Sequence, residues 1–361
     1  MGKYIKAGIL LCMCIWFIGC GTEPVTKKQE DKTVDTVAES IKENADSETE
    51  SVMETENDSE TESVMETEND GETESIMETE SVAERIICWG DSLTFGQGGN
   101  GVTYPYILEE KLNLEVINYG IQGETARQIA IRMGVLPMTT GAFTIPADNT
   151  PVEITLWQGG EDPIMMRLGD CAINPCKING IEGIVSYRAE DNKYYFVRTK
   201  AGENTEVKEG TIVETFASQD KKTSDIVVLF AGTNLPPDKH TVGELIDMEK
   251  KMLEYLGTDK YIVVGLTSKK LIPDIEPINE ALAEAFGEHF LDIRKYLLEN
   301  GLKDAGIEPT KKDKKNIKKG EIPSSIRVDE VHGNEAFYRI IGEQVYNKLE
   351  EMGYILEMHK K

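Results

Sequence analysis

A serine in a glycine-rich turn is the first residue of this sequence that could do chemistry. Ser92 stands in Gly-Asp-Ser-Leu directly after the apolar run 86–89, and several glycines follow it. A tight turn at the end of a strand is how an α/β enzyme presents a serine nucleophile. The motif alone fits a structural turn equally well. A catalytic interpretation therefore requires a base, an orienting acid and an oxyanion site elsewhere in the chain.

Three further blocks contain residues that could supply those groups. Gly123 lies in Asn-Tyr-Gly-Ile-Gln-Gly, Asn234 ends Gly-Thr-Asn, and Asp329 and His332 are the ends of Asp-Glu-Val-His. Each block follows a predicted strand or precedes a predicted helix. Sites in mostly parallel sheets gather at the carboxyl ends of strands, so we expect these blocks at one edge of one sheet.

The blocks, in this order, resemble the GDSL or SGNH hydrolase superfamily, which is named for a serine, a glycine, an asparagine and a histidine. The resemblance covers residues 85–134 and 225–352, and Leu235 departs from the aspartate that many relatives have at that position. It implies a serine hydrolase in which an acyl group is transferred to the serine and then to water.

The resemblance also implies a role for each matched residue. Ser92 would be the nucleophile, His332 the general base and Asp329 the acid that orients the imidazole. The backbone N–H groups of Ser92 and Gly123 and the side-chain amide of Asn234 would form the oxyanion hole. We therefore expect the structure to bring these residues close together.

Neighbouring polar residues have competing interpretations. We expect Asp91 to cap a helix or bond the turn backbone rather than act in catalysis, and Glu124 to be an acid in the first turn of a helix. His240 and His289 are rival bases. His240 lies in a loop near Asn234, whereas His289 opens a short predicted strand and is expected to be structural.

The surrounding segments alternate between strand and helix patterns. Strands are predicted at 86–89, 114–118, 226–231, 261–266 and 289–293, and helices at 104–112, 124–133, 242–256, 277–286 and 334–352. Such alternation predicts an α/β fold with a mostly parallel sheet covered on both faces. We expect a three-layer α/β/α hydrolase domain of SGNH or flavodoxin-like type, formed by residues 85–134 and 225–361.

A different pattern interrupts this domain between residues 135 and 224. Short β-type runs separated by turn residues predict an inserted antiparallel β-rich subdomain, too large for an ordinary loop. Its aromatic residues Trp157, Tyr187, Tyr194 and Tyr195 could form a carbohydrate platform. Their alternation favours the core of the subdomain over that role.

The N-terminal residues have the pattern of a bacterial lipoprotein signal. Lys3 and Lys6 precede an apolar run at 7–18 that is too short to span a membrane, and Gly19-Cys20 follows. Residues 1–20 are therefore predicted to be a signal peptide, with lipid attached to Cys20. An uncleaved, weak membrane anchor is the alternative.

An acidic repeat separates this signal from the predicted domains. Residues 47–58 recur at 59–70 with a period of twelve, and segment 21–84 contributes most of the formal net charge of −26. High charge and low hydrophobicity predict a disordered, extended linker. A calcium- or partner-binding tail is the alternative, although the spacing matches no calcium loop.

No metal or other cofactor is expected. Cys171 and Cys176 lack a second ligand pair at zinc spacing, and whether they form a disulfide stays open. Cys88 is expected to be a buried packing residue. The lysine-rich run 311–319 is expected to be a solvated loop, with contact to anionic polymers or lipid headgroups as the alternative. It has no interleaved aromatic residues, so nucleic acid is not an expected partner.

These expectations combine into an exported serine esterase held by lipid on the outer face of a bacterial membrane. At that location the first-choice substrate is O-acetyl groups on carbohydrate. A lipase, lysophospholipase or thioesterase would use the same Ser92, Asp329 and His332. A non-catalytic surface lipoprotein that binds glycan is the alternative from another class.

Overall fold

The structure is a computed structural model that describes residues 85–112, 114–157, 172–234 and 242–355. All described residues belong to one compact unit. The predicted signal peptide with Cys20 and the predicted acidic linker lie outside the described residues. Within the described ranges, no helix is long and apolar enough to cross a membrane.

Five of the described strands form one parallel sheet, in the order β14-β13-β12-β1-β2. Their bounds are β1 Arg85–Gly90, β2 Glu115–Gly120, β12 Ile226–Phe230, β13 Tyr261–Val264 and β14 Phe290–Leu291. Every pair is parallel, and the central strands β1 and β12 are buried along their whole length. The predicted α/β fold with a mostly parallel sheet is confirmed.

Helices connect these strands, and several of them begin at a side-chain cap. Their bounds are α2 Ser92–Phe95, α3 Tyr104–Leu112, α4 Ala126–Met133, α6 Phe216–Asp220, α7 Val242–Leu256, α8 Ile275–Phe286, α9 Ile293–Glu299, α10 Gly301–Asp304, α11 Lys311–Lys318 and α12 Glu335–Glu351, with the 3-10 helices η1 Gly287–His289 and η2 Ser324–Ile326. The Thr103 hydroxyl accepts from the N–H of Tyr106 at the start of α3. Asn334 caps α12 in the same way through Phe337. Side-chain caps satisfy N–H groups that the first turn of a helix leaves unpaired.

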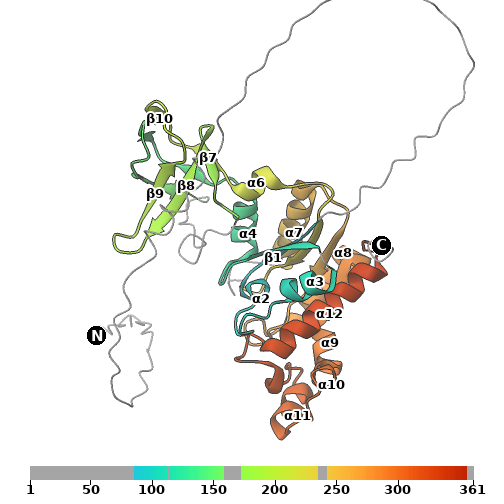
Figure 1. Ribbon diagram of the computed structural model, residues 1–361. Helices are drawn as coiled ribbons and strands as arrows, with labels where there is room; N and C mark the ends of the chain where they lie inside the picture. Colours follow the sequence, from blue (N-terminus) through green and yellow to red (C-terminus); the bar gives the residue numbers. More distant parts are fainter. Residues whose placement is uncertain (1–84, 113, 158–171, 235–241, 356–361) are drawn as a thin grey trace, which may run out of the picture. The chain divides into compact units, whose positions relative to one another are not determined.

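The parallel sheet has an apolar core on each face. Successive side chains of a strand point to opposite faces, so the two buried strands divide between two clusters. Cys88 and Val228 pack with side chains of α3, α9 and α12. Trp89 and Leu229 pack with side chains of α4, α7 and α8. Figure 1 shows α12 lying along α3, and the loop before α12 contains the predicted Asp-Glu-Val-His block.

The described part of the segment between α4 and β12 forms separate antiparallel sheets (Figure 1). Its strands are β3 Thr139–Thr140, β4 Phe143–Ile145, β5 Val152–Ile154, β6 Leu156–Trp157, β7 Cys176–Ile178, β8 Ile181–Arg188, β9 Lys193–Arg198, β10 Thr205–Val207 and β11 Thr211–Glu214. Seven of them follow the order β5-β9-β8-β7-β11-β3-β6, and β10 pairs with β4. Their buried residues form a third apolar cluster. An antiparallel sheet separate from the parallel one was predicted here and is confirmed.

The expectation that Glu124 lies in the first turn of a helix is wrong. Helix α4 begins at Ala126, and Thr125 is its N-cap, with a capping box formed by Thr125 and Gln128. The capping box fixes the start of the helix after Glu124. Glu124 therefore belongs to the loop that leaves β2.

The expectation of a loop at residues 311–319 is also wrong. Thr310 and Asp313 form a capping box that starts α11 at Lys311. The buried Asp313 carboxylate also accepts hydrogen bonds from Ser324 and Ser325, which fix the helix against η2. Lysine has a good helix propensity, so a capped and anchored lysine-rich segment becomes a helix.

Replacing Leu229 by alanine should destabilise the parallel sheet strongly. The side chain is fully buried in β12, so its loss removes apolar contacts and leaves a cavity, costing about 2–5 kcal/mol. Urea unfolding followed by circular dichroism would measure the loss. Ile212→Ala, in an exposed position of β11, is the matched control and should change stability by about 0.5 kcal/mol or less. Equal effects of the two substitutions would contradict the assignment of this core.

Candidate active site

Ser92 lies at the carboxyl end of β1 as the first residue of the short helix α2. Asp91 is the N-cap, and its Oδ1 accepts from the N–H of Leu93 at 3.0 Å. This capping role was predicted for Asp91 and is confirmed. As the first helical residue, Ser92 has an N–H with no acceptor within its own helix. The turn therefore presents both the hydroxyl and the N–H of Ser92 at the strand end.

Two glycines allow α2 to sit tightly against the sheet. A Cβ at Gly120 would lie 2.1 Å from the backbone N of Phe95, and one at Gly90 would lie 2.5 Å from the carbonyl oxygen of Phe230. Backbone atoms cannot move aside cheaply, so only glycine fits at either strand end. Asn118 adds a direct tie, because its side-chain amide donates to the carbonyl of Thr94 at 2.9 Å.

The structure brings Ser92, His332 and Asp329 into one chain of hydrogen bonds. Ser92 Oγ lies 2.9 Å from His332 Nε2, across 240 positions of sequence. His332 Nδ1 lies 2.8 Å from Asp329 Oδ2. A serine hydroxyl, an imidazole and a carboxylate that form such a chain have the geometry that can activate a serine as a nucleophile.

Backbone donors hold the Asp329 carboxylate in its charged form. Its Oδ1 accepts from the N–H groups of Val331 and His332, each at 2.7 Å. Partial burial opposes ionisation, but these bonds and the His332 ring keep the pKa of Asp329 below its usual value. An ionised carboxylate can only accept, so Nδ1 of a neutral His332 carries the proton. Nε2 is then free to accept the hydrogen of the Ser92 hydroxyl.

The loops that contain Ser92 and His332 are packed directly against each other. Gly98, with a φ of +90°, approaches Val328 so closely that a Cβ on it would lie 2.5 Å from a methyl carbon of that side chain. Tyr338 of α12 donates its hydroxyl hydrogen to the carbonyl of Gln97 at 2.7 Å. These contacts hold the loop of Ser92 at a fixed distance from the loop of His332.

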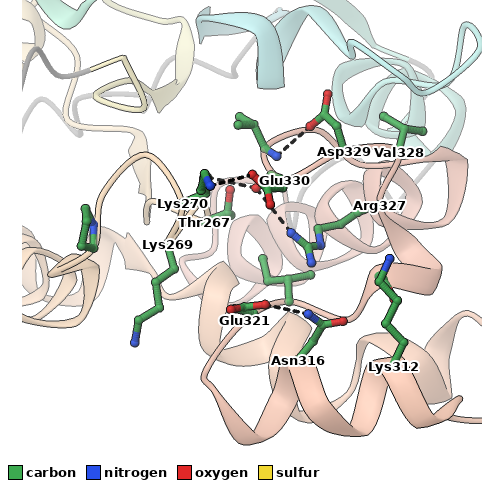
Figure 2. Close-up of a pocket in the computed structure, with 15 residues that line it drawn as sticks. Thr267, Lys269, Lys270, Lys312, Asn316, Glu321, Arg327, Val328, Asp329 and Glu330 are labelled. Atoms are coloured by element: carbon green, nitrogen blue, oxygen red, sulfur yellow. Dashed lines mark hydrogen bonds and ion pairs between the residues drawn. The ribbon is translucent and has the colours of Figure 1, made fainter.

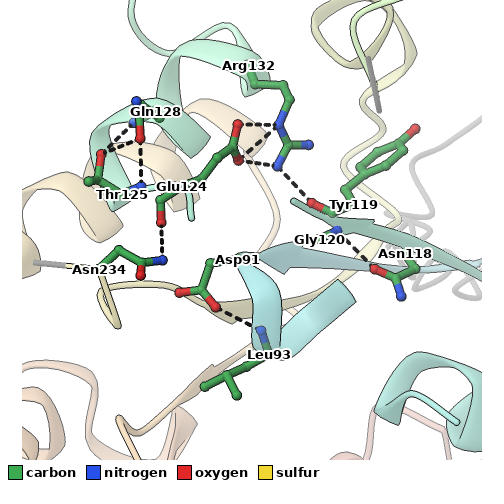
Figure 3. Close-up of polar contacts among 10 residues, drawn as sticks. All are labelled: Asp91, Leu93, Asn118, Tyr119, Gly120, Glu124, Thr125, Gln128, Arg132 and Asn234. Carbon is green, nitrogen blue, oxygen red and sulfur yellow. Dashed lines mark hydrogen bonds and ion pairs between the residues drawn. The ribbon is translucent and has the colours of Figure 1, made fainter. Parts of the chain in front are cut away.

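Asn234 lies next to the loop that contains Gly123. Its side-chain amide donates to the carbonyl oxygen of Glu124 at 2.9 Å (Figure 3). A side-chain amide has two N–H groups, so this bond orients the Asn234 side chain and leaves its second donor for another acceptor. Gly123 has a φ of +79°, which favours glycine.

A buried ion pair supports this loop and was not foreseen from the sequence. Glu124 and Arg132 are both fully buried, and their nearest oxygen and nitrogen are 2.6 Å apart (Figure 3). Burial raises the pKa of Glu124, and the guanidinium of Arg132 opposes that rise. Arg132 also donates to the carbonyl of Tyr119 and lies 4.9 Å from the centre of the Trp89 ring. The sequence did contain a signal for this ion pair, because Arg132 lies within the otherwise apolar face of the predicted helix.

The rival histidines have different outcomes. His289 packs face to face with Tyr261, with 4.0 Å between ring centres, and its Nδ1 lies 3.1 Å from the Tyr261 carbonyl oxygen. These contacts agree with the structural role expected for it. His240 lies outside the described residues.

The four aromatic residues singled out in the inserted segment differ in burial. Tyr194 belongs to the buried cluster of the insert, and Tyr187 packs against that cluster. This agrees with the core role favoured for them. Tyr195 is half-buried beneath Arg188. Trp157 is 44% exposed, so the core role expected for it is wrong.

Within the described part of the chain, the cysteines and the possible metal ligands form no second candidate site. Cys88 is fully buried, as expected for a packing residue. Cys176 is a buried free thiol whose Sγ lies 3.6 Å from the carbonyl oxygen of Gly183. Cys171 lies outside the described residues. No group of three or more histidine, cysteine, aspartate or glutamate residues that could hold a metal occurs within the described ranges.

Comparison with known proteins finds similarity to solved structures, and the three described below share 12–16% sequence identity with this chain. No protein-family model matches the chain, and no curated protein matches it. A lipolytic protein of the G-D-S-L family from Veillonella parvula DSM 2008 is 16% identical; the match covers 73% of this chain and 96% of that one, with a TM-score of 0.38. A lipase/acylhydrolase from Enterococcus faecalis is 12% identical, with 74% and 96% covered and a TM-score of 0.36. A psychrotrophic esterase from a Pseudoalteromonas species is 12% identical, with 74% and 98% covered and a TM-score of 0.36. The interpretation of the site rests on its own geometry.

Asp91 should make the stability of the protein depend on pH. Burial raises the pKa of its carboxyl from 3.8 to about 7. Between those pH values the folded protein holds a proton that the unfolded chain has released, so the free energy of unfolding falls as pH rises. Asp91→Asn keeps an oxygen that can cap α2 but removes the titration.

The asparagine variant should therefore gain stability relative to wild type by a few kilocalories per mole between pH 4 and pH 7. Urea unfolding of both proteins at the two pH values measures this change. A stability difference that stays constant with pH would show that Asp91 does not titrate in this range in the folded protein.

Proposed function

We propose that this protein is a serine ester hydrolase of the GDSL/SGNH type, with a three-layer α/β/α catalytic domain. The observation that carries the proposal is the unbroken chain of hydrogen bonds from Ser92 through His332 to Asp329. A serine hydroxyl is a weak nucleophile at neutral pH, and this arrangement is what activates it. Ser92, His332 and Asp329 are proposed as nucleophile, general base and orienting acid.

The first half of the reaction transfers the acyl group to the enzyme. Ser92 Oγ attacks the ester carbonyl carbon while His332 Nε2 takes the hydroxyl proton. The imidazolium that forms is stabilised by Asp329, which stays ionised. Collapse of the tetrahedral intermediate breaks the bond to the alcohol oxygen, and His332 returns the proton to that oxygen. The products of this half are the free alcohol and an acyl ester on Ser92.

The negative charge of the intermediate needs donors placed in advance. The N–H of Ser92, the N–H of Gly123 and the second N–H of the Asn234 amide are proposed for this role. The hydrogen bond from Asn234 to the Glu124 carbonyl supports it, because it orients the amide beside the Gly123 loop. One such donor typically contributes about 10²–10³-fold to turnover.

The second half returns the enzyme to its starting state. A water molecule gives a proton to His332 as its oxygen attacks the acyl carbon. The second tetrahedral intermediate collapses, the bond between Ser92 Oγ and the acyl carbon breaks, and Ser92 recovers its proton from His332. No cofactor enters either half of this proposed cycle.

The proposed substrates are O-acetyl groups on carbohydrate outside the cell. The lipoprotein signal predicted at Cys20 and the extended linker predicted at 21–84 support this, because they would hold the hydrolase domain at the outer membrane face, among polysaccharides. The exposed side chain of Trp157 suits stacking on a sugar ring. Lipase, lysophospholipase or thioesterase activity would need the same catalytic residues and a longer acyl pocket.

Ser92→Ala should abolish hydrolysis of p-nitrophenyl acetate. Removing the nucleophile of such a triad lowers kcat by at least about 10³-fold, and we expect that loss with the far-UV circular dichroism unchanged. Ser186→Ala, an exposed serine of β8, is the matched control and should keep full activity. Equal rates for wild type and Ser92→Ala would exclude this serine as the nucleophile. They would favour a non-catalytic glycan-binding protein.

The acyl preference should separate deacetylation from lipolysis. For an acetyl-sized pocket, kcat/KM should fall by about tenfold or more between p-nitrophenyl acetate and butyrate, because added methylenes have no room. The same series extended to octanoate covers the lipase range. A kcat/KM that rises with chain length would replace the deacetylase proposal with a lipase. Release of acetate from acetylated xylan or peptidoglycan then identifies the alcohol.

A further inference from the structure

Helix α11 presents four lysine side chains along one side. They are Lys311, Lys314, Lys315 and Lys318, and all four are exposed. At 3.6 residues per turn, these positions fall within about 100° of one another around the helix axis and within about 10 Å along it. We call this row the lysine stripe. It contains no acidic residue.

The opposite side of α11 is anchored to the rest of the domain by polar contacts. Asp313 is fully buried and Asn316 is nearly so. The Asp313 carboxylate accepts hydrogen bonds from Ser324 and Ser325 of η2. The Asn316 amide donates to the Glu321 carboxylate at 2.6 Å (Figure 2). Because this side is fixed, the lysine stripe is held facing outward.

The four ammonium groups of the lysine stripe have no counter-charge among the described residues. Lysines elsewhere in the domain are paired with glutamates, as Lys111, Lys193 and Lys348 are. Like charges three and four positions apart on a helix repel each other, and the stripe contains both spacings. The capping box and the contacts of Asp313 therefore hold four cations together against their own repulsion.

This concentration of positive charge stands out in an acidic chain. The formal net charge of the protein is −26, so its charge as a whole repels anions. A partner that presents negative charges in a row would relieve the repulsion within the stripe. The arrangement thus favours an anionic partner at this place on the surface.

We propose that the lysine stripe binds a linear polyanion that carries one carboxylate or phosphate on each repeating unit. Successive charges of the polymer would pair with successive lysines along α11. This surface is separate from the proposed ester hydrolysis and does not depend on it.

The composition of α11 decides between classes of anionic partner. The four cations are spread over about 10 Å of open surface, so a single small anion reaches only part of the stripe. A helix that lies in a bilayer surface needs an apolar face. Here the face opposite the stripe is polar and anchored, and Ile317 is the only apolar residue of the helix. Surfaces for single-stranded nucleic acid add aromatic side chains, which α11 lacks.

Fluorescence anisotropy of labelled polygalacturonate, titrated with the full-length protein at low ionic strength, tests this surface. Polyphosphate, monomeric galacturonate and vesicles containing phosphatidylglycerol serve as competitors at equal anion concentration. We expect saturable binding of polygalacturonate and competition by polyphosphate, because a lysine ammonium acts as a point charge toward either anion. The monomer and the vesicles should compete much more weakly.

Substitutions within the stripe locate the binding. Lys315→Gln should weaken polygalacturonate binding about two- to fivefold, as expected for one exposed ion pair. It should also lower the slope of log K against log salt by about 0.7. Replacing all four lysines of the stripe by glutamine should abolish binding. Glutamine is a good helix former, so the far-UV circular dichroism should not change.

Lys208→Gln is the matched control, because it removes one exposed lysine from the turn between β10 and β11 and changes the net charge equally. It should bind polygalacturonate as tightly as wild type.

Three results would overturn the proposal. The first is the absence of saturable polygalacturonate binding at low salt. The second is an equal loss of affinity in Lys315→Gln and Lys208→Gln, which would show a response to net charge alone. The third is stronger competition by vesicles than by polyphosphate, which would make a lipid surface the partner.

Discussion

The hydrogen bond between Ser92 Oγ and His332 Nε2 joins two points 240 residues apart in sequence, and much of the structure serves to keep that distance. A hydrogen bond tolerates a few tenths of an ångström, so both ends must be held by rigid elements. At one end, the buried strand β1 delivers the serine. At the other, α12 packs on α3 and carries the loop that contains the histidine. Tyr338 and Gln97 join the two loops directly.

The acidic residues around Ser92 differ in how deeply they are buried and in what compensates their charge. Asp329 is partly exposed and kept ionised by backbone donors, which suits an acid that stabilises an imidazolium. Asp91, one residue before Ser92, is buried so deeply that its pKa rises to about 7. Glu124 is buried too, but Arg132 compensates its charge. Three carboxyl groups near one serine thus have three different environments and three different roles.

The sequence predicted what depends on local pattern. The apolar run of β12, the cap at Thr103 and the placing of functional blocks at strand ends all follow from periodicity and residue type. The sequence did not predict features that depend on contacts with residues outside the local pattern. Lysine-rich α11 is a helix because Asp313 is bonded by serines beyond the helix. The pairing of Glu124 with Arg132, eight positions apart, depends on where the capping box at Thr125 starts α4.

The position of the insert has a consequence for how the chain folds. Strands β1 and β12 are hydrogen-bonded neighbours, with Ile86 opposite Ile226, although the whole antiparallel segment lies between them in sequence. Loop closure entropy grows slowly, by about 0.6 kcal/mol for each doubling of length, so the insert costs the final stability of the sheet little. It affects rate more, because non-local parallel pairing forms late. Hairpins such as β8–β9 have nearby partners and are expected to form before the sheet that presents the serine.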